Sequence, residues 1–456
     1  INIVTNSKIK KNQFLSFGLR ASSSPNASPW ASYVWANEKM SLNLFVNGSY
    51  SQWKNITNGY STSFADNADH TGLDTTNHTS YNGDSFSNNF GGGFNINFDY
   101  NIDTMNTISV WVGGWPNASK SNSFNETFRH EYMQDSGMYH YKTYGNSNGM
   151  GNFFNGGLQY LHKFNNEGHN ISLRMTGNIS NGYSNNYHKK YYETQTWMDV
   201  DYRELSSHKD FGYGVNLDYT LPYSENGEIG IGASYEYSPD TYYMSYDTLA
   251  GDVYVTDIMR SYDRNVGSNE YDIYFTLQQK FGNFVVKPGI RMEYERLWCN
   301  IDGYAISDIN KDYLNWRPSI HLSYRTKSMH NFSLSYSRRI APPSARNLTD
   351  YKFYSSESFT TGNPDLLSTY TNSIEAGWTT GNPELLPTYT TSVEGGWTKY
   401  WNKFGSVGLT AYYRDSKNTV DDISDVIYDD FFGRYIQYSY PVNVGKSSRK
   451  GLEANV

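Results

Sequence analysis

The chain lacks the features of a disulfide-stapled domain, a zinc protein or a helical membrane protein. Its 456 residues include a single cysteine, Cys299, which excludes an internal disulfide and cannot by itself form a zinc site. We interpret Cys299 as an incidental thiol at a strand end. No run of about eighteen apolar residues occurs, which excludes bilayer-spanning helices.

An excess of basic residues is also missing. The 37 Lys and Arg are outnumbered by 45 Asp and Glu, for a net charge of -8, and the absence of a basic stripe argues against binding to nucleic acid. No His-Glu-x-x-His or phosphate-binding loop is present. The acidic run Asp66–Asp74 lacks the bidentate Glu that ends an EF-hand loop and is interpreted as a solvated loop. We therefore expect no enzyme, no metal site and no cofactor.

The chain combines a high content of aromatic residues and glycine with a strongly polar overall composition. It has 43 Tyr, 39 Gly and 17% aromatic residues, yet its mean hydropathy is -0.70. Composition alone fits a secreted β-sandwich or propeller as well as a membrane barrel. A transmembrane barrel explains both properties, because only every second strand residue faces lipid and long polar loops lower the mean hydropathy.

Apolar and polar residues alternate with period two along the chain, which predicts strands. Clear examples lie at 94–100, 171–179, 215–221, 271–278 and 319–325. With their flanks these run to about nine to eleven residues, the length a tilted strand needs to cross the hydrocarbon, whereas a sandwich strand needs about five or six. We expect about seventeen strands on this criterion.

The connections alternate between short turns and long polar segments. Short turns are expected near 36–40, 101–105, 164–169, 222–227, 281–283, 326–331, 399–405 and 441–449. The long polar segments are 54–88, 117–150, 181–210, 239–267 and 340–369. Outer-membrane barrels place short turns on the periplasmic side and long loops outside, so the predicted fold is an all-β, transmembrane antiparallel β-barrel. The candidates for its interfacial aromatic girdles are Trp53, Trp111, Trp115, Tyr223, Tyr237 and Trp316.

One stretch carries a more specific signal. Tyr-Ser-Arg-Arg at 336–339 is followed by Pro-Ser at 343–344, Gly-Asn-Pro-Asp-Leu at 362–366 and Glu-Ala-Gly at 375–377. This set resembles the barrel part of TonB-dependent outer-membrane receptors. The resemblance implies a Gram-negative outer membrane and a barrel of about 22 strands. It also implies that residues 1–10 are a junction from a missing N-terminal plug, that 11–456 form the barrel, and that C-terminal strands are missing.

The same resemblance implies a function. Extracellular loops of the family bind a scarce nutrient, a plug closes the lumen, and TonB drives active uptake through an N-terminal segment missing here. The expected partners are outer-membrane lipids, TonB and surface lipoproteins. Two alternatives stay open: a non-transporting structural or docking barrel of an outer-membrane complex, and an outer-membrane enzyme with a catalytic dyad at its rim.

Two sets of candidate site residues follow. If apolar strand residues face lipid, charged residues of the opposite parity point into the lumen, because a charge on the lipid face costs about 2–4 kcal/mol at the midplane. These lumen candidates are Arg174, Glu236, Asp272, Arg291, Glu293, Arg317, His321 and Arg325. They could contact a plug and line the substrate route, or only hold neighbouring strands together by charge pairing. The loop candidates for ligand contact are Tyr132, Tyr139, Tyr141, Tyr242 and Tyr243, whose alternative role is to stabilise the loops.

An internal repeat interrupts the pattern. Thr361–Trp378 is nearly copied by Thr380–Trp397. Few residues remain between the copies to turn the chain around, so we expect that both cannot be full strands running in the same direction of one closed sheet. One copy is then an extended extracellular loop or an error in the assembled sequence, and the error is favoured.

Overall fold

A computed structural model describes residues 12–22, 25–66, 73–132, 137–193, 195–302, 308–326, 330–354, 358–380, 393–401, 405–417, 420–429, 434–443 and 446–455. Strands dominate this part of the chain. The helices described are the 3-10 turn η1 (Thr196–Met198) and the short α1 (Ala345–Leu348). No helix in the described ranges is long and apolar enough to cross a membrane. The expected plug junction at residues 1–10 lies outside the described residues.

The main sheet has eighteen strands in the described residues, close to the seventeen expected, and β10 is a four-residue strand beside β9. Its strands are β1 (Asn12–Ser22), β2 (Asn26–Ala36), β3 (Met40–Asp66), β4 (Leu73–Asn101), β5 (Asn106–Glu131), β6 (Gly137–Lys163), β7 (Asn170–Tyr192), β8 (Val200–Ser224), β9 (Gly227–Ala250), β10 (Val253–Thr256), β11 (Tyr262–Phe281), β12 (Phe284–Ile301), β13 (Ile309–Arg325), β14 (His330–Ala341), β17 (Thr369–Thr380), β18 (Val393–Trp401), β19 (Gly405–Lys417) and β22 (Lys446–Asn455). A smaller sheet contains β15 (Phe353–Tyr354), β16 (Phe359–Thr360), β20 (Val420–Asp429) and β21 (Arg434–Asn443).

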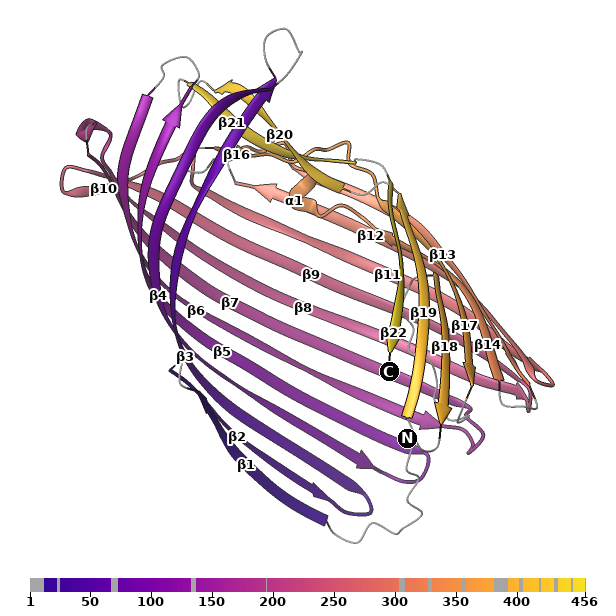
Figure 1. The fold of residues 1–456 in the computed structure, drawn as a ribbon. Coiled ribbons are helices and arrows are strands. Elements are labelled where there is room, and N and C mark those ends of the chain that lie inside the picture. Colours follow the sequence, from indigo (N-terminus) through magenta and orange to yellow (C-terminus); the bar gives the residue numbers. More distant parts are fainter. Residues whose placement is uncertain are drawn as a thin grey trace.

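Long neighbouring strands pair antiparallel and curve into a tall wall (Figure 1). The ladder runs from β1 through β9, continues through β11 to β14, and reaches β22 by way of β17, β18 and β19. In the described residues no ladder joins β1 to β22, so the wall is open between these edges. The predicted antiparallel barrel wall is confirmed.

The strand ends that flank the expected short turns from 36–40 to 399–405 lie at one end of the wall. The predicted turn at 441–449 is wrongly assigned, because Lys446 pairs with Lys417 and Asn455 with Gly408, so β22 begins at the opposite end. The long polar segments also differ from the prediction. They are not loops for most of their length, because β3 and β4 extend to 27 and 29 residues and stay paired with each other as far as Asp66 and Leu73. Backbone N–H and C=O groups need partners even outside a membrane, and a hairpin ladder supplies them. Polar side chains on both faces do not oppose this, since both faces of the projecting hairpins meet water.

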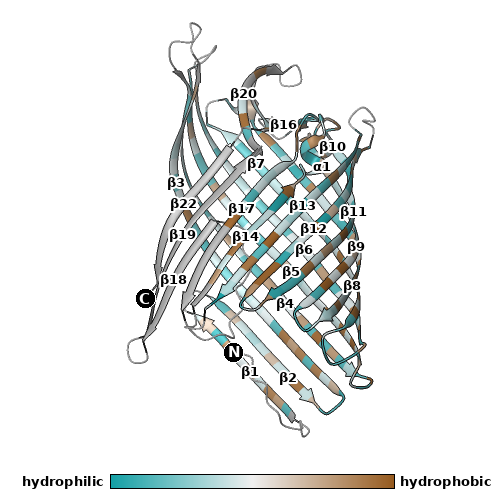
Figure 2. Ribbon diagram, turned by 90° about the vertical axis from the view of Figure 1, so that its right-hand side faces the viewer, coloured by the Kyte–Doolittle hydropathy of each residue, from teal (hydrophilic) through white to brown (hydrophobic). Residues whose placement is uncertain are grey.

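The two faces of the wall differ in polarity. Phe275 pairs in register with Ile231 on one side and Ile290 on the other, and all three side chains are exposed. Apolar bands of this kind recur across the wall (Figure 2). A contiguous apolar outer band identifies the lipid-facing surface of a membrane barrel.

Half of the predicted girdle residues are wrongly assigned. Tyr223, Tyr237 and Trp316 lie on the apolar face. Trp53, Trp111 and Trp115 have the parity of the polar face, on which Ser41 and Ser109 donate hydrogen bonds to Asp99. The ring of Trp111 lies 4.7 Å from the guanidinium carbon of Arg174, a cation–π contact inside the wall. An aromatic residue near a strand end can therefore point into the lumen instead of toward the lipid interface, and amino-acid composition does not distinguish the two positions.

The repeated segment forms two neighbouring strands. The end of β17 in the first copy pairs parallel with β18 in the second, through Trp378 with Trp397 and Thr379 with Thr398. Strand β19 pairs with β17 at three positions and with β18 at nine. Only β18 therefore forms a long ladder with β19. Residues 381–392 of the second copy lie outside the described residues, and the choice between loop and sequence error stays a prediction.

Candidate functional site

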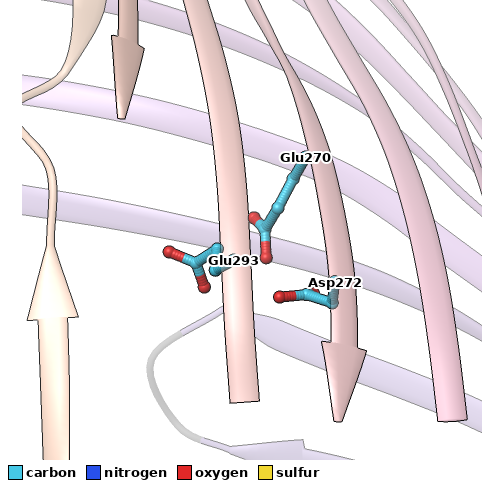
Figure 3. A group of neighbouring side chains, drawn as sticks. All are labelled: Glu270, Asp272 and Glu293. Carbon is cyan, nitrogen blue, oxygen red and sulfur yellow. The ribbon is translucent and has the colours of Figure 1, made fainter. Parts of the chain in front are cut away.

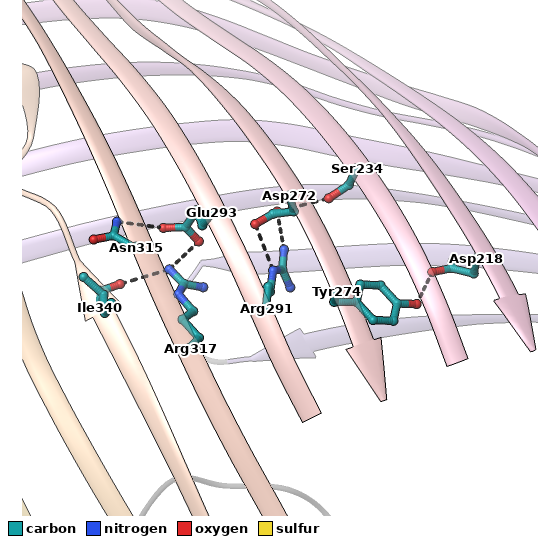
Figure 4. A network of polar contacts seen from close by, with 9 residues as sticks. All are labelled: Asp218, Ser234, Asp272, Tyr274, Arg291, Glu293, Asn315, Arg317 and Ile340. Atoms are coloured by element: carbon teal, nitrogen blue, oxygen red, sulfur yellow. Dashed lines mark hydrogen bonds and ion pairs between the residues drawn. The ribbon is translucent and has the colours of Figure 1, made fainter. Parts of the chain in front are cut away.

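Cross-strand register gathers charged side chains on the inner face of β9, β11, β12 and β13. One row, which we call the acidic row, consists of Ser234, Asp272, Glu293 and Asn315. The next row toward the short turns, the arginine row, consists of Tyr274, Arg291 and Arg317. Period two puts both rows on the face opposite Phe275, because Asp272 and Tyr274 have the other parity of β11. Figure 4 shows the two rows together.

Asp272 is held from two sides. Arg291 donates from Nε to its Oδ1 at 2.9 Å, and the Arg291 Nη2 contacts Oδ2. The Ser234 hydroxyl also donates to Oδ2, at 3.0 Å. Asp272 is only 4% exposed, so its carboxylate depends on these donors in place of water.

Glu293 is buried more deeply, at 1% exposure. Arg317 Nη2 lies 2.6 Å from its Oε2, and Asn315 Nδ2 donates to Oε1 at 3.4 Å. The same Arg317 nitrogen donates to the carbonyl of Ile340 at 3.1 Å, which connects the row to the end of β14. Arg291 and Arg317 thus neutralise the buried carboxylates of Asp272 and Glu293.

A third carboxylate belongs to this group. Oxygens of Glu270, Asp272 and Glu293 all lie within 4.8 Å of one another (Figure 3). Three such oxygens could ligate a hard cation, but Arg291 and Arg317 already compensate two of them. The contacts present describe a network of ion pairs that joins three strands.

Above the charged rows, the segment that follows β14 folds onto the inner wall. Odd-numbered residues of β12 continue from Glu293 to Leu297, Cys299 and Ile301, which are buried. The residues that cover them are Ala345, Leu348, Tyr351, Phe353 and Leu366. We call the described residues 342–354 and 358–366 the inner segment; α1 within it lies at the mouth of the wall (Figure 1). The prediction that 340–369 is simply a long loop is therefore incomplete, because its apolar side chains find a core inside the wall.

The Gly-Asn-Pro motif holds the inner segment in place. The Gly362 N–H donates to the Thr349 carbonyl at 2.8 Å, and the Asn363 N–H donates to the Asn347 carbonyl at 2.7 Å. The Asn363 side chain donates to the carbonyl of Pro441 in β21 at 3.2 Å. A Cβ at position 362 would meet the carbonyl oxygens of Thr349 and Asn347, so this close approach requires glycine.

Cys299 lies two residues before the end of β12, as predicted, but it is part of a packed cluster and not incidental. Its exposure is 0%, and it lies in the cluster beneath the inner segment. A small apolar side chain fits between a strand and a packed segment, and free cysteine behaves as one. The period-two pattern of β12 shows which face Cys299 lies on, but it does not show that the inner segment covers this side chain.

The structure brings together four of the eight predicted lumen residues: Asp272, Arg291, Glu293 and Arg317. Glu236 lies opposite Glu270 in the next row, and Arg174 lies farther along the wall against Trp111. His321 and Arg325 lie on β13 toward the short turn, away from the acidic row. All eight have the parity of the face opposite Phe275, but they do not form one site.

The predicted tyrosines also fall into separate places. Tyr141 lies against Tyr192, with ring centroids 5.2 Å apart, and Lys190 Nζ is 4.0 Å from the Tyr141 ring. Tyr139 approaches the same Tyr192 ring, whereas Tyr132 packs on His130.

On β9, Tyr242 packs on Tyr262 inside the wall, while its neighbour Tyr243 is exposed on the other face. Strands β7 and β8 lie between β6 and β9. The five tyrosines therefore do not converge on one ligand position.

Sequence reasoning missed several members of the network. They are Ser234, Glu270, Tyr274 and Asn315. Period-two parity from Asp272 would have found Glu270 and Tyr274. The side-by-side placement of Asn315 and Glu293 needs the strand register, which no single strand encodes.

One motif of hydrolases occurs in an unsuitable place. Gly145–Gly149 matches the Gly-x-Ser-x-Gly spacing around Ser147. It lies inside β6, paired with β5 and β7 on both sides. A nucleophile elbow needs a sharp strand-to-helix turn, so this match carries no catalytic geometry.

Several solved structures match the chain at low sequence identity. The copper transporter OprC matches with a TM-score of 0.56 and 8% identity, over 98% of this chain and 59% of OprC. The Serratia marcescens hemophore receptor HasR matches with a TM-score of 0.49 and 11% identity, over 97% of this chain and 60% of HasR. The Pseudomonas aeruginosa ferric enterobactin receptor PfeA gives 0.44 and 11%, over 97% and 58%. The chain thus spans no more than 60% of these proteins' length.

No curated protein sequence matches the chain. The model of the outer membrane protein beta-barrel family matches residues 162–380 and 377–456, and the two matches meet where the repeated segments adjoin. The likeness to OprC confirms, at the level of the fold, the predicted resemblance to outer-membrane receptor barrels. The chain belongs to the outer membrane protein beta-barrel family, and its place is the bacterial outer membrane.

Proposed function

We propose that this chain forms the wall of a transporter that takes up a nutrient across the outer membrane. The observation that carries the proposal is the difference in polarity between the two faces of the wall. The outer face has an apolar band, and the inner face at the same level has buried, paired charges. Such an inner face accepts polar material, either a plug or a solute, at a depth where the outer face meets lipid.

The projecting hairpins offer a surface for ligand capture. On their inner face, the Tyr202 ring stacks between His188 and Tyr246, at centroid distances of 4.8 and 4.9 Å. Lys190 and Tyr141 lie on the same face of the neighbouring strands. Aromatic faces beside cations suit a ligand that has flat apolar surfaces and hydrogen-bonding groups.

The energised step is inferred from the resemblance to TonB-dependent receptors. In this proposal a plug packs inside the wall, and the outward end of the lumen is narrowed by the inner segment. Asp272, Arg291, Glu293 and Arg317 hold the wall rigid where the plug would slide. They act as positioning residues in this scheme.

Uptake is tested in paired bacterial strains with and without the complete gene. Both strains grow in the same medium, and mass spectrometry follows which small molecules disappear. The proposal expects at least one compound to be depleted only by the gene-bearing strain, and depletion to stop when a protonophore collapses the energising gradient.

The competing function is a docking barrel for surface lipoproteins. The inner segment favours this alternative in one respect, because packed residues occupy part of the mouth. Identical depletion by both strains, together with a lipoprotein that copurifies in stoichiometric amounts with the full-length protein, would replace transport by docking.

A further inference from the structure

Trp115 provides a flat aromatic surface on the inner face of the wall. Its Cδ1 atom lies 2.6 Å from the position that a Cβ would take at Gly93, and its Cη2 atom lies 2.9 Å from the equivalent position at Gly113. The indole therefore lies along β4 and β5, in space that a side chain at either glycine would fill. The other face of the ring points into the lumen, and Trp115 is 37% exposed.

Phe153 enlarges this aromatic surface. It is the register partner of Trp115 on β6, and the two ring centroids lie 5.8 Å apart. Their planes differ by 33°, so the rings lie side by side and do not stack on each other. Trp115 is nine residues from Asn106, where β5 leaves its short turn. At about 3.4 Å per residue and a tilt of about 40°, it lies roughly 23 Å up the wall, near the extracellular end of the apolar band.

Three asparagines border the aromatic surface. The Oδ1 atom of Asn47 lies 3.1 Å from the Cβ position of Gly93, beside one end of the indole. The Oδ1 atoms of Asn95 and Asn155 lie 2.7 and 2.9 Å from that of Gly113, beside the other end. Within the described ranges, none of these three side chains forms a hydrogen bond with another residue. Each amide thus keeps a donor and an acceptor for a ligand.

Trp111 shows what a covered ring looks like on the same face of β5. It lies four residues nearer to the short turn, and a Cβ at Gly157 would meet its ring. The guanidinium carbon of Arg174 lies 4.7 Å from the ring centroid. A side chain of the protein therefore already covers Trp111, whereas Trp115 leaves one face open.

An open aromatic face bordered by uncharged amides indicates the class of ligand. The C–H groups on one face of a sugar ring pack against an aromatic face, and sugar hydroxyls both donate and accept hydrogen bonds, as amides do. Neither the two aromatic residues nor the three asparagines carry a charge. A ligand with carboxylate or phosphate groups would lose hydration here without gaining a cation.

We propose that this surface binds a neutral oligosaccharide. One sugar ring packs on Trp115 and the next reaches Phe153, while Asn47, Asn95 and Asn155 form hydrogen bonds with the hydroxyls. The inference rests on the proposed function in one respect, because it makes a sugar the solute that is taken up. Binding itself does not depend on transport.

Binding to the full-length protein tests the proposal. The protein is held in micelles of lauryldimethylamine oxide, a detergent without a sugar, and is applied to an array of neutral and acidic oligosaccharides. Calorimetry then gives the dissociation constant of the neutral oligosaccharide that binds best. Trp115→Leu should raise that constant about tenfold, the effect of losing one aromatic contact.

Two further variants separate binding from folding. Asn95→Ala combined with Asn155→Ala should also raise the dissociation constant about tenfold, through the loss of two hydrogen bonds. Trp111→Leu is the matched control and should bind as wild type does, because Arg174 covers its ring. Heat-modifiable mobility on gels verifies that each variant is folded.

Three results would overturn the proposal: no binding to any neutral oligosaccharide, a preference for acidic ones, or equal weakening by Trp111→Leu and Trp115→Leu. Transport and binding can fail separately. Sugar binding without uptake would contradict the transport function alone. Energised uptake of another compound without sugar binding would contradict the oligosaccharide site alone.

Discussion

Arg291 and Arg317 are direct cross-strand partners on β12 and β13, yet each leans toward a carboxylate of the neighbouring row. Like charges placed opposite each other normally destabilise a sheet. Here Arg291 binds Asp272 and Arg317 binds Glu293, so the two cations are held by separate anions. The acidic row and the arginine row therefore depend on each other.

Removing one arginine should expose this dependence. Arg317→Ala leaves Glu293 buried without its cation, and breaking a buried pair costs roughly 3–5 kcal/mol of unfolding free energy. Urea unfolding in micelles measures the loss. The double variant Arg317→Met with Glu293→Gln should recover much of it, because no unpaired charge remains. Equal losses in the single and double variants would contradict the pairing.

The inner segment can be opened at its glycine. Gly362→Ala pushes a Cβ against the Asn347 carbonyl oxygen, 2.6 Å from the ideal position, and should detach the segment from the wall. Cys299 then becomes accessible to maleimide. A loss of roughly 1.4 kcal/mol in local stability raises the labelling rate about tenfold.

Gly177→Ala is the matched control for this substitution. A Cβ there would meet only the Gly212 carbonyl oxygen, at 3.8 Å, an ordinary contact. Its labelling rate should equal that of wild type. If Gly362→Ala also labels at the wild-type rate, Cys299 is not covered by the segment.

The sidedness of β11 can be tested with one charge on each face. Ile273→Arg puts a cation on the lipid-facing side and should cost about 2–4 kcal/mol of folding free energy in bilayers. Gln278→Arg, on the inner parity of the same strand, should cost much less. The fraction folded into vesicles, read from gel mobility, gives both values. A larger loss at position 278 would reverse the assignment of faces.

The turn between β4 and β5 should respond to pH through Asp103. The backbone N–H of Met105 donates to its carboxylate at 2.7 Å, and with the Asn106 amide this holds the pKa of Asp103 below its ordinary value of 3.8. The carboxylate therefore stabilises the turn above that ordinary pKa, and the effect disappears as pH falls through the lowered value.

Amide hydrogen exchange at Met105 and Asn106 measures this effect. Asp103→Ala should speed exchange at neutral pH relative to wild type, and the difference should vanish in acid. Asp103→Asn retains an acceptor oxygen and should give an intermediate rate with little dependence on pH. A difference between wild type and Asp103→Ala that persists at the lowest pH would rule out the carboxylate as the cause.

The sequence by itself determined that the chain forms period-two strands, which face most of their side chains take, and most of the short turns. Period-two alternation around Tyr271, Ile273 and Phe275 reflects a physical constraint that acts on each strand separately: one face meets lipid and the other does not. Inward parity of Asp272, Arg291, Glu293 and Arg317 followed from the same constraint. The Gly-Asn-Pro motif marked an important loop without showing its packing.

Only the tertiary structure decided which inward residues meet. Strand register brings Asn315 beside Glu293, and register depends on pairing between segments far apart in the sequence. Parity likewise could not show that the inner segment folds back over Cys299, because that cover depends on apolar side chains from two separated segments burying one another. Alternation within one strand determines which face a side chain takes. Which other side chains it contacts depends on the free energy of the whole assembled wall.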